Sequence, residues 1–216
     1  MICFPLRGAW AVRRFLAVAH GDRLEALFVV ALTTGLRRGE LLGLKWEDVD
    51  LSKGTLHVRR SAGRVYKGGV QVGEPKSASG RRQVLLSRQA IQALREHRPR
   101  QSQDRLLAGE QWQEKGFIFT SATGTPVESS TLARAFERLT ERAELPRIPF
   151  HGLRHTYASM MLAEGVHPKI VQQALGHAKI SLTLDLYSHA LPTLQEQAVQ
   201  AVERALEASS KPIATV

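Results

Sequence analysis

A segment that follows Pro149 contains a histidine and an arginine that are close in the sequence. His151 and Arg154 are three residues apart, so on a helix both side chains project from the same side. An arginine guanidinium is planar and always charged, and its fork of donors matches a phosphate group. The two side chains together could bind a phosphate or another oxyanion. Ordinary surface pairs have the same spacing, so this motif alone does not establish a site.

His151 and His155 are four residues apart, a spacing that zinc-binding helices use. Gly152 stands where such helices usually have a glutamate, and no third ligand is close in the sequence. We therefore expect no metal here. A metal-dependent hydrolase is the alternative interpretation, and a chelator would test it.

Three further segments contain residues that can act on a phosphate. Arg37 follows a glycine break in a helical region, and Glu40 lies three residues later, where it could orient Arg37. His177 follows a helix-ending glycine, and Tyr187 comes ten residues after it. Each also has a structural explanation: a surface arginine at a turn, a capping histidine or a core tyrosine.

Hydrophobic periodicity predicts the elements that must position these residues. We expect helices over residues 8–20, 24–32, 38–44, 151–164, 168–175 and 181–189, and others that begin at Ser87, Ser130 and Pro192. Alternating apolar residues predict a strand over 54–60, and strands are also expected at 70–72 and 82–86, joined by a loop over 74–81. This order indicates one α+β domain, mostly α-helical, with a small antiparallel sheet.

The positive charge is concentrated in one part of the chain. The net charge is +10, from 30 basic and 20 acidic residues. Residues 51–100 contain 12 basic and two acidic residues, so this segment alone accounts for the whole excess. Such a local field favours a polyanion, above all nucleic acid, although a solvated basic surface is the alternative.

Composition excludes several classes of protein. The 216 residues are 43% hydrophobic and 23% charged, which is typical of a globular domain. The single cysteine, Cys3, excludes an intramolecular disulfide and a cysteine-rich zinc module, and favours a reducing compartment, the cytoplasm. The longest apolar stretch, residues 26–36, is too short to span a membrane, and the first six residues do not form a signal peptide.

The motifs gain meaning from their order. TGLRRGEL at 34–41 is followed by Pro75-Lys76-Ser77, then HGLRHT at 151–156, LGH at 175–177 and YSH at 187–189. This series resembles the catalytic domain of the tyrosine recombinases, the phage integrase family. The resemblance extends from about residue 23 to about residue 189 and is specific in combination.

The resemblance implies a fold and a set of site residues. The fold is the integrase-type catalytic domain, with a small antiparallel sheet and a mobile β-hairpin. The implied catalytic residues are Arg37, Lys76, His151, Arg154, His177 and Tyr187, with Glu40 as support for the first arginine. The residues expected to touch DNA are Arg59, Arg60, Ser79, Arg81 and Arg82.

The implied chemistry is strand cleavage by a tyrosine. A tyrosine hydroxyl has a pKa of about 10, so Tyr187 must lose its proton as it attacks phosphorus. Two guanidinium groups offset the charge that grows on the phosphate oxygens. Lys76 would protonate the departing 5′ oxygen, and His151 would assist proton removal from the tyrosine. The product is a 3′-phosphotyrosyl link that conserves the bond energy, so no cofactor, ATP or metal is expected.

The resemblance also divides the chain. We expect residues 1–20 to be a short remnant and helix without the usual core-binding domain, 21–190 to be the catalytic domain, and 191–216 to be a terminal helix and tail. That helix would pack on a neighbouring protomer or fold back on its own domain, and paired DNA sites would carry a homotetramer. The alternatives are a DNA-binding integrase remnant with little recombination and a type IB topoisomerase.

Overall fold

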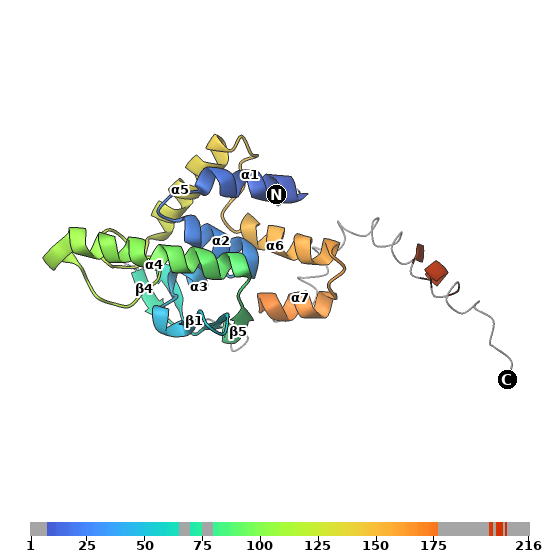
Figure 1. Cartoon of the computed structure of the whole chain (residues 1–216), viewed down its shortest axis with the longest axis horizontal. Coiled ribbons are helices and arrows are strands. Elements are labelled where there is room, and N and C mark those ends of the chain that lie inside the picture. The colour runs from blue at the N-terminus through green and yellow to red at the C-terminus, as the bar shows by residue number, and fades with distance from the viewer. Residues whose placement is uncertain are drawn as a thin grey trace.

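The computed structural model describes residues 8–64, 70–74, 80–176, 199–200, 202–204 and 206, which are mostly helical (Figure 1). The helices are α1 (Gly8–Ala19), α2 (Glu25–Thr34), α3 (Arg38–Leu42), α4 (Arg88–Ala108), α5 (Ser129–Arg142), α6 (Gly152–Ala163) and α7 (Pro168–Leu175), with 3₁₀ turns at Trp46–Asp48 and Gly109–Gln111. The strands are β1 (Val49–Asp50), β2 (Thr55–Val58), β3 (Ser61–Arg64), β4 (Val70–Gly73) and β5 (Arg82–Leu85). None of the described helices is long and apolar enough to cross a membrane.

Helix α2 lies at the centre of the fold. Its residues are apolar on every side, and almost all of them are buried, which is typical of a helix enclosed by other elements. It contacts α1, α4 and α6, and Figure 1 shows α1 and α5 on one side of it and the strands on the other. Phe28 of α2 packs edge-on against Phe15 of α1, with 5.3 Å between the ring centroids. The expected mostly helical α+β fold is confirmed.

The strands form two antiparallel sheets where the sequence predicted one. Strands β1, β2 and β5 form a three-stranded sheet in that order, while β3 pairs only with β4. The predicted alternation in β2 is correct, since Leu56 and Val58 are buried. The prediction of a single sheet is wrong because the chain leaves β2 at residues 59–60 and continues in a separate strand over 61–64. That strand, Ser-Ala-Gly-Arg, has no apolar alternation that would have predicted it.

The helix starts were predicted with mixed success. Ser87 caps α4 as expected, since its hydroxyl oxygen accepts a hydrogen bond from the Ala90 amide at 3.1 Å. The predicted cap at Ser130 is wrong: α5 begins at Ser129 and Glu128 occupies the cap position. The expected helix over 181–189 lies outside the described residues. Of the helix expected after Pro192, only the helical residues 199–200, 202–204 and 206 are described.

Gly35 ends α2 at the point where three helices meet. Its φ is 62°, in the left-handed region that favours glycine. A Cβ atom there would lie 2.4 Å from Cδ1 of Tyr157 in α6 and 2.8 Å from Cδ2 of Leu175 in α7. The missing side chain therefore allows α6 and α7 to approach the end of α2.

We predict that Gly35→Ala lowers the free energy of unfolding by about 2–4 kcal/mol, because backbone strain adds to overpacking. Gly21→Ala is the matched control, since Gly21 also has a positive φ, 79°, but a Cβ atom at this position would meet no other atom within 4 Å. Urea denaturation of both variants measures the difference. Equal losses of unfolding free energy in the two variants would show that the close approach of α6 and α7 to Gly35 does not add to the destabilisation.

Candidate active site

Arg37 is the residue that precedes α3, and Glu40 holds it as the sequence predicted. One oxygen of Glu40, Oε2, accepts a hydrogen bond from the Arg37 amide at 2.8 Å. The other, Oε1, accepts from Nη1 of the Arg37 side chain at 2.9 Å. Glu40 is buried, whereas the Arg37 side chain is 39% exposed and has more donors than this pair uses. The Arg37 guanidinium is therefore held by Glu40 and remains partly exposed to solvent.

Arg82, from β5, is the second partner of Glu40. Its Nη2 and Nη1 atoms donate to the two carboxylate oxygens at 3.0 and 3.2 Å. Burial alone would raise the pKa of Glu40, but the hydrogen bonds and charge of Arg82, together with the bonds from Arg37, lower it below its ordinary value. The carboxylate is thus ionised at neutral pH and bridges two arginines.

Arg154, from α6, also lies at this site. It is 4% exposed, and it donates to the Gly35 carbonyl at 2.6 Å and to the Leu175 carbonyl at 2.7 Å. Arg37 donates to the next carbonyl, that of Gly176, at 3.0 Å. Burial and the nearby charge of Arg37 lower the pKa of Arg154 to about 9, so it remains charged at neutral pH. The two arginines predicted to bind phosphate therefore meet at the end of α7.

His151 occupies the N-terminal cap position of α6, one turn before Arg154. Its ring packs edge-on against that of His155, with 4.9 Å between centroids. Partial burial, followed by the charges of His155 and Arg154, lowers the pKa of His151 to about 4. A neutral imidazole beside the arginines can accept a proton, as the predicted role requires.

We predict that His151 titrates near pH 4 in the free protein and at higher pH once a DNA phosphate lies beside it, because a negative charge favours the protonated ring. DNA binding should then take up protons between about pH 4 and 6.5. A histidine in the unfolded chain titrates near 6.5, so the same shift makes the free energy of unfolding fall as the pH drops through this range. NMR titration of the His151 ring, with His151→Asn to assign its signal, measures both states. A pKa near 6.5 in the free protein would contradict this account.

The residues expected to touch DNA fall into two groups. Arg59 and Arg81 are more than half exposed, and Arg81 pairs with Glu74. Arg60 is less exposed and pairs with Glu47 and, at 2.6 Å, with Asp48, while Arg82 is only 10% exposed. A pocket of about 500 Å³ over β2 and β5 is lined by His57, Val58, Arg59, Arg81, Arg82 and Gln83.

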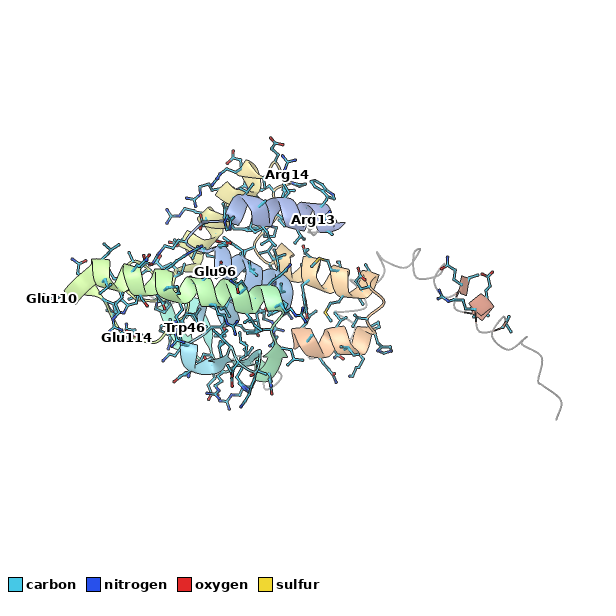
Figure 2. All side chains as sticks on the ribbon, viewed as in Figure 1. Arg13, Arg14, Trp46, Glu96, Glu110 and Glu114 are labelled. Atoms are coloured by element: carbon cyan, nitrogen blue, oxygen red, sulfur yellow. The ribbon has the colours of Figure 1, made fainter. Side chains whose placement is uncertain are left out.

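Two acidic residues follow α4, which ends at Ala108. Figure 2 shows Glu110 and Glu114 beyond the last residue of α4, near the end of that helix opposite to α6 and α7. Glu114 pairs there with Arg105 at 2.9 Å.

Four predicted residues cannot be placed: Lys76, Ser79, His177 and Tyr187 lie outside the described residues. Of the catalytic set, the structure brings together Arg37, His151 and Arg154, with Glu40 beneath them. Sequence reasoning missed the internal role of Arg82, which it assigned to DNA. The alternation of side chains along β5 could have predicted this role, because Arg82 lies on the same face as the buried residues Val84 and Leu86.

Comparisons with known proteins agree with this geometry. The model of the phage integrase family matches residues 11–193. A protein named tyrosine recombinase XerC-like, from Caldanaerobacter subterraneus subsp. tengcongensis, is 38% identical over 202 residues, which is 88% of this chain and 51% of that protein. The chain spans about half the length of the curated relatives it matches.

Two solved structures share the fold. The Tn1549 transposon integrase in complex with transposon right end DNA superposes with a TM-score of 0.72 at 25% identity, over 88% of this chain and 65% of that one. The XerA recombinase gives a TM-score of 0.70 at 25% identity, over 92% of this chain and 64% of that one. With its motifs in family order and two arginines gathered at one helix end, this chain belongs to the phage integrase family.

Proposed function

We propose that this chain is the catalytic domain of a site-specific DNA recombinase that cleaves and rejoins strands through Tyr187. The observation that carries the proposal is the convergence of Arg37 and Arg154 on the end of α7, with His151 beside them. Arg37 lies at the start of α3, whereas His151 and Arg154 lie at the start of α6, and each has a chemical use at a phosphodiester. The family membership supports the same activity.

The two arginines would bind the non-bridging oxygens of the scissile phosphate. An arginine has five N–H donors, and the contacts with Glu40 and the carbonyl groups leave others free on both side chains. A planar fork fixed in this way binds the phosphate without having to reorganise during the reaction. Glu40 would keep Arg37 in place while the phosphate is exchanged between strands.

The reaction would be a direct transesterification. The Tyr187 oxygen forms a bond to phosphorus as its proton passes to neutral His151, and the bond to the 5′ oxygen breaks. Lys76 gives its proton to that oxygen, which leaves as a free hydroxyl. A 5′ hydroxyl from a partner strand then attacks the 3′-phosphotyrosyl link and releases the tyrosine. Atoms and charge balance without ATP or metal.

The basic segment over 51–100 would hold the DNA, with the exposed Arg59 and Arg81 on its backbone. The Tn1549 integrase was solved with transposon DNA, which supports a duplex as the substrate here. We further propose a homotetramer on paired DNA sites, and action in the cytoplasm.

A trapping experiment tests the proposal. Nicked duplexes from the DNA that flanks the gene let the cleaved strand diffuse away, so the covalent intermediate accumulates. After denaturation, a gel should show protein joined to DNA, equally with and without a chelator. Loss of the band on chelation would favour a metal enzyme, and relaxation of supercoiled DNA without sequence preference would favour a topoisomerase. Salt-sensitive binding without any band would favour a DNA-binding remnant.

A further inference from the structure

The C-terminal end of α7 is bound by three arginines from three different elements. The carbonyl oxygens of Ala174, Leu175 and Gly176 accept hydrogen bonds from Arg82, Arg154 and Arg37, respectively, at 3.0, 2.7 and 3.0 Å. The last carbonyl groups of a helix have no partner within it, and they carry partial negative charge. Three cations on three successive carbonyl groups therefore fix the position of this helix end.

Arg82 differs from the other two arginines because its side chain donates four hydrogen bonds to protein oxygens, whereas those of Arg37 and Arg154 donate two each. Its side chain is 10% exposed, with Glu40 on one side and the Ala174 carbonyl on the other. Nε, Nη1 and Nη2 all donate to protein oxygens, and Nη1 also reaches the Gly80 carbonyl at 3.3 Å. Few donors remain for a DNA phosphate, and the side chain lies on the buried face of β5.

Two segments of the predicted site adjoin the elements that Arg82 joins. His177 is the next residue after Gly176, at the end of α7. Lys76 precedes β5 by a few residues in the chain. A bond from the first residue of β5 to the end of α7 therefore links the two elements that lead into these segments.

We propose that Arg82 is a positioning residue for the active site: it ties β5 to Glu40 and to the end of α7, and so sets where Arg37 and the residue after Gly176 stand relative to the phosphate. This inference rests on the proposed recombinase function. It replaces a direct DNA contact by Arg82 with an indirect role, and the two roles predict different measurements.

The test compares Arg82→Gln, Arg82→Lys and a matched control, Arg23→Gln. Arg23 resembles Arg82 because it also joins a carboxylate and a backbone carbonyl, those of Asp104 and Ser121, at 2.8 Å each. It precedes α2, at the opposite end of that helix from Gly35. Any general effect of losing such a link should appear in both glutamine variants.

For Arg82→Gln we expect covalent adduct formation at saturating nicked DNA to slow about 100-fold, the size of effect that a displacement of about 1 Å produces. The salt dependence of DNA binding should stay unchanged. Arg82→Lys should recover part of the rate, since an ammonium can still pair with Glu40. Arg23→Gln should cleave at the wild-type rate even if its unfolding midpoint falls as far.

Two further measurements separate Arg82 from the leaving-group step and from activity altogether. A duplex with sulfur in place of the bridging 5′ oxygen needs no proton donor, so it should rescue Lys76→Ala but not Arg82→Gln. The amide NMR signals of Gly176 and His177 should shift in Arg82→Gln and not in Arg23→Gln.

Each contrary result has its own meaning. A wild-type rate in Arg82→Gln, or unmoved amide signals, would overturn the inference. A salt slope reduced by about one, with the rate at saturation unchanged, would make Arg82 a phosphate contact instead. If the sulfur duplex restored the cleavage rate of Arg82→Gln, Arg82 would instead act in the protonation of the departing 5′ oxygen. If the wild-type protein forms no adduct on any duplex, the proposed function is wrong. That result is obtained with the wild-type protein alone, so it is distinct from every result obtained with the variants.

Discussion

Replacing Arg154 with alanine is expected to slow DNA cleavage by about 10³-fold or more, the lower end of what an arginine on a transferring phosphoryl group contributes in other enzymes. It should also lower the free energy of unfolding by roughly 2–4 kcal/mol, since the buried carbonyl groups of Gly35 and Leu175 both lose their donor. One side chain would then serve both catalysis and the junction of α2, α6 and α7.

Arg154→Lys separates these two losses. Lysine keeps the charge, but its compact ammonium cannot donate to both carbonyl groups and to a phosphate in one plane. We expect it to recover part of the stability and little of the rate. Arg13→Ala, on α1, is the charge-matched control, because α1 packs against α2 and α5 and lies apart from α7 (Figure 2).

The rates should be measured as single-turnover adduct formation at saturating DNA, below the unfolding midpoint of every variant. Cleavage by Arg154→Ala within tenfold of wild type would contradict a direct role at the phosphate. A comparable loss in Arg13→Ala would show that the assay reports net charge.

The order of the motifs predicted a set of residues of which the structure brings Arg37, His151 and Arg154 together, although no motif did so alone. Arg37 lies far along the chain from His151 and Arg154, and its gathering with them follows from a family resemblance rather than from local spacing. Glu40 was predictable because it is three residues from Arg37, within reach across one helical turn. The bonds of Arg82 and Arg37 to α7 join residues 92 and 139 positions apart, so no local pattern contains them.

The errors in the fold have similar causes. Serine is a preferred capping residue, but α5 begins at Ser129 with Glu128 at the cap position, so the capping signal of Ser130 lies two residues too late. Strands β4 and β5 have comparable alternation, and the partner of each depends on how the chain leaves β2. Arg82 was expected to touch DNA because Ser79, Arg81 and Arg82 resemble the hairpin pattern of the family, while the face of β5 that it shares with Val84 is buried.

Tyr187→Phe is expected to abolish the covalent adduct altogether, which is the largest effect among these predictions. The substitution keeps the aromatic ring and removes only the oxygen that forms the bond to phosphorus. DNA affinity and its salt dependence should therefore stay close to wild type, because the arginines and the basic segment are intact. A variant that still forms the adduct would show that another residue is the nucleophile.

The most direct test of the central claim is to identify the residue that carries the DNA. The adduct trapped on a nicked duplex would be digested with protease and nuclease, and its peptide sequenced by mass spectrometry. The account predicts a nucleotide 3′-phosphate on Tyr187, with a free 5′ hydroxyl on the released strand. Attachment to another residue, or through a 5′ phosphate, would contradict it.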